Sequence, residues 1–298
     1  MPVQRRPGQP RRNSSGLGRD LEILDLLSSS EALQSGGLGV VRVAELTGRD
    51  KAVISRALAT LASAGLVTRH PGTLAYRLGP KLFALAAQTI EAALVAEARP
   101  YLRAITRHTG ETTHLCVLRE GNVLTLISEL SPHEVRTRGW QGITTAAWRT
   151  PSGWVLLSDW AEQELASWYA EHGHDLAVLN DPVTTPGRSS PFAIADTGQA
   201  RRVQVRDLPS LLTATARIRQ QGYAISDEDL ELGVVAVSAP VTGFTGSVIA
   251  ALNVSAPKAR TGSHLDTLGR YVASAAKAIS QHLGGMAAEI TSPRQHRS

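Results

Sequence analysis

Several residue types that support catalysis or metal binding occur in the chain, but their spacing favours simpler roles. His172 and His174 lack the i, i+4 spacing of two metal ligands on one helix face. Cys116 lies in an apolar run, which predicts a buried thiol. Ser152 is outside any Gly-x-Ser-x-Gly elbow. The acidic run 227–229 fits a solvated cap as well as an acid–base pair.

The phosphate-cradling pattern Gly-x-x-x-x-Gly-Lys is also missing from the sequence. No combination of residues therefore predicts an enzyme, and we expect no cofactor and no metal.

A different chemistry, the recognition of DNA, is indicated by a helix expected over residues 50–63. Its inward face is predicted to comprise Val53, Ile54, Ala57, Leu58 and Leu61. The opposite face combines small side chains with cations, which suits close approach to a major groove about 12 Å wide. The residues expected to contact DNA on this helix are Lys51, Ala52, Ser55 and Arg56.

The neighbouring segments predict the frame that would position this helix. A helix over 20–28, a polar loop to residue 39 and a two-turn helix at 43–47 precede it, with a turn at Gly48 and an N-cap at Asp50. Strand, turn and strand follow over 66–78. The pattern is typical of a winged helix-turn-helix, and we expect Arg69 and His70 at the hairpin tip to contact the DNA backbone or minor groove.

The charge distribution agrees with a polyanion partner at the N-terminal end. Residues 1–80 hold 11 Lys and Arg against six acids, whereas the rest of the chain holds 20 of each. Beyond residue 18 the excess shrinks to seven against six. A protein-binding winged helix, whose basic face is only solvated and contacts no DNA, therefore stays as an alternative.

The length and composition indicate two globular domains. The chain has 298 residues, of which 42% are hydrophobic and 19% charged. A single cysteine excludes an internal disulfide, and no apolar run is long enough to span a membrane. We expect a cytoplasmic protein without a membrane partner.

The larger C-terminal part alternates apolar strands and helices. The expected strands are 113–118, 123–130, 234–241 and 247–254, and the expected helices are 100–108, 152–160, 161–172, 207–220 and 264–283. This order predicts an α+β chain whose second domain is one antiparallel sheet covered by helices.

A linker helix is expected over 80–99, beginning at Pro80 and carrying an apolar stripe. The stripe comprises Phe83, Ala87, Ile90 and Leu94. It is suited to a dimer seam, a domain linker or packing on its own domain. The predicted organisation is a disordered basic tail (1–18), the winged helix-turn-helix (19–79), the linker (80–99), the second domain (100–285) and a disordered tail (286–298).

Two groups of motifs, in the right order, carry a family resemblance. The N-terminal group is Val43–Gly48, Val53–Leu61, Gly65–Val67 and Tyr76–Gly79, and the C-terminal group is Gln221–Ala224, Asp227–Asp229, Gly233–Val241 and Ala250–Pro257. They resemble the two domains of the IclR family of bacterial transcription regulators. The resemblance implies a GAF-like effector-binding domain, a homodimer or homotetramer, and a palindromic double-stranded DNA operator.

The resemblance also implies an effector pocket between the sheet and a loop that usually reads Pro-Leu-His-x-Thr-x-x-Gly-Lys. The matching loop residues are Trp148, Thr150 and Gly153, and the other wall is expected to comprise Ser226, Asp227, Val234, Ala236, Asn253 and Ser255. Trp148 replaces the usual His, and Trp154 replaces the Lys. This favours a larger, flatter or aromatic effector, while core packing of the tryptophans, including Trp140, is the alternative.

The resulting hypothesis is a DNA-binding transcription regulator that responds to a small-molecule effector. The alternatives are a protein-interaction winged helix with a structural, non-ligand-binding C-terminal domain, and an enzyme with a regulatory N-terminus. The effector, the operator sequence, repression against activation and dimer against tetramer stay open at this stage.

Overall fold

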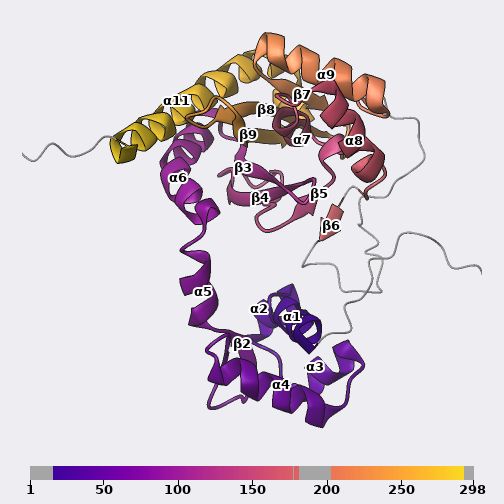
Figure 1. Cartoon of the computed structure of the whole chain (residues 1–298), viewed down its shortest axis with the longest axis vertical. Coiled ribbons are helices and arrows are strands. Elements are labelled where there is room, and N and C mark those ends of the chain that lie inside the picture. The colour runs from indigo at the N-terminus through magenta and orange to yellow at the C-terminus, as the bar shows by residue number, and fades with distance from the viewer. Residues whose placement is uncertain (1–15, 177, 181–202, 292–298) are drawn as a thin grey trace, which may run out of the picture. The chain divides into compact units, whose positions relative to one another are not determined.

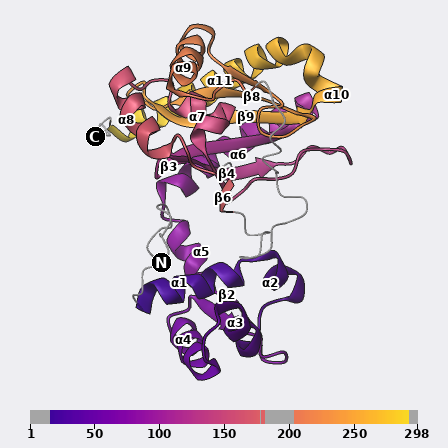
Figure 2. The ribbon, with the colours of Figure 1, turned by 90° about the vertical axis from the view of Figure 1, so that its right-hand side faces the viewer.

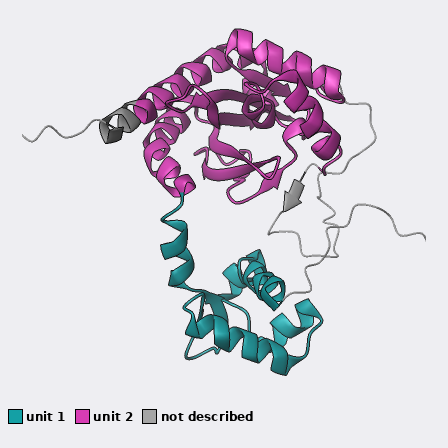
Figure 3. Cartoon of the chain, viewed as in Figure 1, with its two compact units in different colours: residues 1–89, 182–188 teal, residues 90–181, 189–298 magenta. Residues whose placement is uncertain are grey.

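The computed structural model describes residues 16–176, 178–180 and 203–291. Within this part the chain divides into two compact units, the first ending at Thr89 and the second beginning at Ile90 (Figure 3). Each unit has its own hydrophobic core.

The first unit combines short helices with a two-stranded hairpin. Its elements are α1 (Gly16–Leu27), α2 (Ser30–Ser35), α3 (Val40–Thr47), α4 (Lys51–Ser63), β1 (Val67–Arg69), β2 (Tyr76–Leu78) and α5 (Pro80–Ala86). Helix α1 packs against α3 (Figure 2). Ile23, Ile54 and Leu58 are fully buried at the centre of the core. A winged helix-turn-helix follows from this order.

Two local sequence signals end α3 and begin α4. Gly48 ends α3 with a φ of 64°, a conformation that costs glycine little. The Asp50 side chain then caps α4 by accepting hydrogen bonds from the backbone N–H groups of Ala52 and Val53. Val53, expected to face inward, is instead 40% exposed.

Two further expectations for the first unit were wrong. Helix α1 begins at Gly16, so residues 16–18 are helical rather than part of a tail, and residues 1–15 lie outside the described part. The loop expected up to residue 39 contains α2. The Ser29 side chain caps this short helix by accepting from the N–H of Ala32 at 3.3 Å.

The single linker helix expected over 80–99 is two helices. α5 ends at Ala86, and α6 spans Ile90–Thr109 with Pro100 inside it. Thr89 donates its hydroxyl to the carbonyl of Ala86 at 2.7 Å in the intervening turn. The predicted stripe is not one buried face, because Phe83 is 79% exposed and Ile90 is 77% exposed. Helix α6 continues through Pro100 because its apolar side packs on the sheet.

The second unit is built on one antiparallel sheet. Its elements are β3 (Thr112–Arg119), β4 (Asn122–Glu129), β5 (Thr144–Thr145), η1 (Ala147–Arg149), α7 (Pro151–Leu156), α8 (Glu162–His172), β6 (Val178–Asn180), α9 (Leu208–Gln221), β7 (Ala224–Asp227), β8 (Val234–Thr242), β9 (Val248–Pro257), α10 (Lys258–Thr261), η2 (Gly262–His264) and α11 (Leu265–Thr291). The strand order is β6-β5-β4-β3-β9-β8-β7.

Alternation along the central strands gives the two faces of the sheet different partners. Leu115, Leu252 and Val254 pack under α6 and α11, whereas Cys116 and Ala251 lie on the face covered by α7, α8 and α9 (Figure 1). The paired strands therefore present two faces with separate cores.

Helix α11 is longer than expected. It continues to Thr291, so residues 286–291 are helical, and residues 292–298 lie outside the described part. Among the described residues, none of the helices combines the length and the hydrophobicity that a membrane span requires.

Candidate nucleic-acid interface and ligand cavity

The four residues expected to read DNA lie together on the exposed side of α4. Lys51, Ala52, Ser55 and Arg56 are all exposed. Ile54 and Leu58 fix the opposite side of the helix in the core. The surface thus presents two cations and two short side chains at the N-terminal half of one helix, a combination that fits a DNA groove.

The two cations of α4 differ from nearby arginines in their ion pairing. Arg42 bonds to Glu31 through Nε at 2.7 Å and to Glu45 through Nη1 at 3.1 Å. Arg49 pairs with Glu22. Within the described residues Lys51 and Arg56 have no ion pair, so their charges are available to a polyanion.

The wing residues have local structural contacts as well as exposure. The Nδ1 atom of His70 accepts from the backbone N–H groups of Gly72 at 3.2 Å and Thr73 at 3.1 Å. The Arg69 guanidinium lies 5.5 Å from the ring centroid of Tyr76. The hairpin tip is therefore held in one shape, with both side chains at the surface.

The second unit contains a cavity of about 90 Å³ between the sheet and the segments on its α7 side. Of the nine residues expected to bind an effector, six line it: Thr150, Ser226, Val234, Ala236, Asn253 and Ser255. Strand register brings the wall together, since Ala236 pairs with Ser255 and Ser238 with Asn253.

The other three expected residues do not line the cavity. Trp148 donates its Nε1–H to the carbonyl of Asp175 at 3.2 Å and packs in the neighbouring core. A Cβ on Gly153 would lie 2.0 Å from the carbonyl oxygen of Ala147, so glycine there permits close backbone packing. Asp227 pairs with Lys258 at 2.8 Å.

Two of the tryptophans do not favour a large, flat effector, because they pack in the core. Trp154 is 1% exposed in the core and donates its Nε1–H to the carbonyl of Trp148 at 2.8 Å. Trp148 and Trp154 thus serve packing, the alternative considered for all three tryptophans, whereas Trp140 lines the cavity.

A buried histidine organises the cavity floor. His114 Nδ1 lies 2.8 Å from Ser128 Oγ, and its Nε2 lies 2.9 Å from Ser255 Oγ. Burial lowers the pKa of His114 to about 4, so the ring is neutral at pH 7. Thr137 Oγ1 extends the network, 2.8 Å from Ser255 Oγ.

A second network of neutral groups lies beside the first. The Asn253 amide donates to Ser238 Oγ at 2.8 Å, and Ser152 Oγ lies 3.0 Å from the same oxygen. Cys116 also lines the cavity, and burial raises the pKa of its thiol to about 11. The floor therefore offers hydroxyl, amide and imidazole groups without formal charge at neutral pH.

Charged groups occur at the solvent side of the cavity. Arg138 and Glu231 are exposed lining residues, and the Arg138 guanidinium lies 4.0 Å from the ring centroid of Trp140. Sequence reasoning did not place His114, Arg138 or Trp140 in the pocket. His114 pairs with Asn253 across β3 and β9, but nothing in the sequence signals this pairing of distant strands.

The residues first considered for catalysis have other partners. His172 Nδ1 lies 2.9 Å from Asp175 Oδ2, a pair formed within one turn of chain. Across the described residues, no cluster of three or more His, Cys, Asp or Glu side chains is arranged to hold a metal ion.

Comparison with known protein families gives two matches that together span most of the chain. Residues 16–71 match the IclR helix-turn-helix domain. Residues 86–179 and 194–281 match the bacterial transcriptional regulator IclR C-terminal domain.

Individual relatives are similar in sequence to this chain over most of their length. The chain is 27% identical over 275 residues to the DNA-binding transcriptional repressor YiaJ of Escherichia coli, covering 91% of this chain and 88% of YiaJ. It is 28% identical over 295 residues to the HTH-type transcriptional regulator BhcR of Paracoccus denitrificans, covering 94% and 95%.

Solved structures share the fold. The Thermotoga maritima IclR structure matches with a TM-score of 0.66 at 20% identity, covering 90% of this chain and 98% of that one. An IclR homologue complexed with 4-hydroxybenzoate, from Microbacterium hydrocarbonoxydans, matches with a TM-score of 0.67 at 17% identity, covering 90% and 100%.

Proposed function

The chain belongs to the IclR family of bacterial transcription regulators, and from this premise we propose how its two units divide the work. The first unit binds one half-site of a palindromic double-stranded DNA operator. The second unit binds a small-molecule effector, which changes operator affinity. Two or four copies of the chain bind together, so that two recognition helices read the two half-sites.

The exposed, unpaired cations of α4 carry the DNA-binding part of the proposal. Lys51 and Arg56 lie on the recognition helix without carboxylate partners among the described residues, while the nearby Arg42 and Arg49 are neutralised. Ala52 and Ser55 let the helix approach base edges, and Arg69 and His70 add wing contacts to the backbone.

The chemistry of the cavity sets the effector class. Its volume of about 90 Å³ favours a small molecule, and its floor of Ser255, Asn253 and neutral His114 favours an uncharged polar end. Arg138 at the solvent side favours a negative charge or a flat group at the other end. Thr150, Ser226, Val234 and Ala236 complete the wall.

Exposed apolar residues of α5 support self-association. Phe83 is 79% exposed and Leu85 is 54% exposed, although both are large hydrophobic side chains on one short helix. We propose that a second copy covers them, which would fix the separation of two recognition helices.

Regulation rather than catalysis is the proposed activity, and a DNA partner supports the proposed location in the bacterial cytoplasm. The relatives YiaJ and BhcR are named a repressor and a regulator, and we expect repression here. No cofactor enters this scheme.

Effector binding is tested by thermal unfolding with a panel of small hydroxylated acids, beginning with 4-hydroxybenzoate, followed by operator titration with each stabilising compound. We expect one compound to raise the melting temperature and change operator affinity at least about tenfold. The Asn253→Ala variant should lose both responses and keep operator affinity without effector. Stabilisation without any change in operator affinity would contradict the regulatory link.

The protein-interaction alternative predicts a different result. A winged helix with a solvated basic face would bind mixed-sequence duplex DNA weakly and without a preferred site, and the cavity would bind no compound from the panel.

A further inference from the structure

One wall of the cavity is formed by a segment without regular secondary structure. Thr137, Arg138 and Trp140 line the cavity, and they belong to the loop 131–140 that follows β4. Val135 in the middle of this loop is 72% exposed, so the loop has no apolar anchor at that point. Its position therefore depends on polar contacts.

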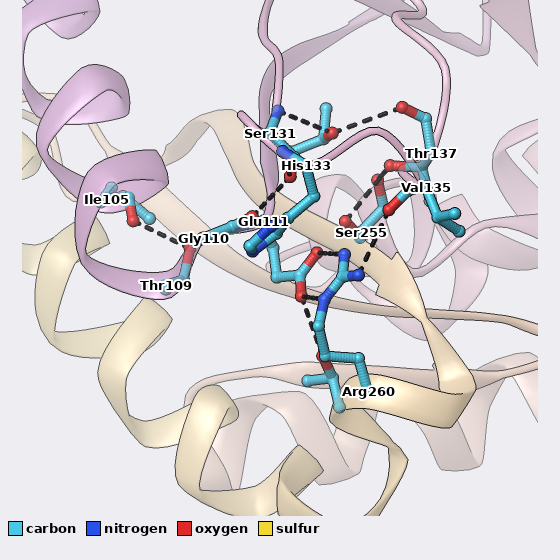
Figure 4. A network of polar contacts seen from close by, with 12 residues as sticks. Ile105, Thr109, Gly110, Glu111, Ser131, His133, Val135, Thr137, Ser255 and Arg260 are labelled. Carbon is cyan, nitrogen blue, oxygen red and sulfur yellow. Dashed lines mark hydrogen bonds and ion pairs between the residues drawn. The ribbon is translucent and has the colours of Figure 1, made fainter.

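These contacts attach one end of the loop to β3 and the turn before it, and the other end to β9 (Figure 4). At one end, Ser131 Oγ donates to the carbonyl of Gly110 at 2.6 Å, and the Ser131 N–H donates to Thr112 Oγ1 at 3.2 Å. At the other end, Thr137 Oγ1 donates to the carbonyl of Ser255 at 3.2 Å.

The middle of the loop is held by an ion pair from another part of the chain. The Glu111 side chain is only 4% exposed, and both its oxygens bond to Arg260, with Nη2 at 2.7 Å from Oε2. The remaining nitrogen of the guanidinium, Nη1, donates to the carbonyl of Val135 at 3.2 Å. Arg260 thus links a buried carboxylate to the loop backbone (Figure 4).

The geometry explains why arginine occupies this position. The planar guanidinium has donors on two edges, so it binds a carboxylate in bidentate fashion and still reaches a carbonyl. Lysine has a single nitrogen and does not satisfy both partners in this way. Removing Arg260 would leave the buried Glu111 carboxylate without its cation, which is strongly unfavourable.

We propose that the Glu111–Arg260 pair is a positioning pair that keeps the loop 131–140 closed against the cavity and so controls how fast small molecules reach the cavity floor. Neither residue lines the cavity, so the pair acts through the backbone of Val135. The regulatory meaning of this closure rests on the proposed effector function, but the closure itself is measurable without an effector.

The chain contains its own reporter of cavity opening. Cys116 is the single cysteine of the sequence, lines the cavity and is 4% exposed. A thiol-reactive maleimide in solution reaches Cys116 only after the cavity has opened or the domain has unfolded.

The test compares maleimide labelling rates of the full-length chain with those of Arg260→Gln and Glu111→Gln. Each variant removes the ion pair, and we expect Cys116 to react at least about tenfold faster. Arg260→Lys keeps the charge but not the two-edged geometry, so its rate should lie between those of the native chain and Arg260→Gln. If Arg260→Gln does not fold, Arg260→Lys and Glu111→Asp supply the comparison.

The matched control is Arg119→Gln, at the opposite end of β3. Arg119 bonds to Glu91 through Nε and Nη2, the same two nitrogens that Arg260 uses. It lies three positions from Cys116, closer along the strand than Glu111, so a general disturbance of β3 would show in this variant. Its labelling rate should stay within about twofold of the native rate.

Parallel urea unfolding separates local opening from loss of global stability. The proposal requires a labelling rate that rises more than the unfolded population does. An unchanged rate in Arg260→Gln and Glu111→Gln, a rate that follows global unfolding, or an equal acceleration in Arg119→Gln would overturn it. Failure of operator or effector binding in the native chain would instead contradict the proposed function and leave the labelling result intact.

Discussion

At the level of single residues, the proposed DNA contact depends on which cations have no carboxylate partner. Lys51, Arg56 and Arg42 are all exposed, yet Arg42 is bonded to two carboxylates and the other two have no ion pair within the described residues. A sequence shows the charges but not the pairing, because Arg42 and Glu31 meet across two helices.

We expect Arg56→Ala to weaken operator binding by about 1 to 3 kcal/mol, as loss of a base-edge contact does. The measurement is a fluorescence anisotropy titration of an operator duplex at two salt concentrations. Arg42→Ala is the control and should change affinity by less than about 0.5 kcal/mol because its charge is already paired. Equal losses in both variants would remove Arg56 from the interface.

A second residue-scale prediction concerns pH. The folded protein lowers the pKa of His114 to about 4 from a model-peptide value of 6.5, because burial disfavours the charged ring. Between about pH 6.5 and 4, His114 is protonated in the unfolded chain and neutral in the folded protein. The free energy of unfolding therefore decreases as pH falls from about 6.5 towards 4. Above that window the contribution is fully present.

We expect His114 to account for a loss of about 3 kcal/mol in the free energy of unfolding over this pH range. The measurement is urea denaturation at several pH values. His114→Gln removes the titrating group, so its stability should fall less over the same window. Parallel pH profiles for the two proteins would show that His114 does not titrate on unfolding.

At the level of secondary-structure elements, the close contact of α7 with η1 leaves no room for a side chain at residue 153. A Cβ on Gly153 would meet backbone atoms of Ala147 at 2.0 to 2.5 Å. Gly153→Ala should therefore destabilise the second unit by about 1 to 3 kcal/mol or more in urea unfolding. Gly284→Ala, a helical position with no atom within 4 Å, should be neutral or stabilising. Similar stability of both variants would contradict a packing role for Gly153.

The sequence predicted elements well where local signals are strong. Gly48, Asp50 and the apolar spacing of 54–61 define the recognition helix, and the apolar runs define β3, β4, β8 and β9. The break between α5 and α6 was missed because the flanking sequence is rich in Ala and Leu and neither Gly nor Pro occurs at residues 87–89.

The cavity illustrates the limit of such reasoning. Short polar residues on β7 and β9 were identified through the family motif, and Ser226, Asn253 and Ser255 do line the cavity. Sequence patterns did not identify His114, Arg138 and Trp140 as cavity residues. Their position depends on strand pairing and on contacts between distant segments, such as that of Arg260 with Val135. The tryptophan substitutions misled for the same reason: packing partners decide the role of a large side chain.

At the scale of the whole molecule, the α5 surface leads to a prediction about assembly. Phe83→Glu places a charge in the proposed contact between copies, so we expect the oligomer to dissociate at concentrations where the native chain stays associated. Sedimentation velocity over a concentration series gives the answer. Leu130→Glu, an exposed apolar position in the second unit, is the control. An unchanged oligomer in Phe83→Glu would place the contact elsewhere.

Sequence-specific DNA binding is tested most directly by selecting bound duplexes from a random DNA pool with the full-length chain and then measuring affinity for the enriched site as salt is raised. We expect a palindromic motif whose half-sites lie about one helical turn or a multiple apart, bound with a steep salt dependence. Enrichment of no motif, with only weak salt-sensitive retention, would contradict a sequence-reading regulator and favour the protein-interaction alternative.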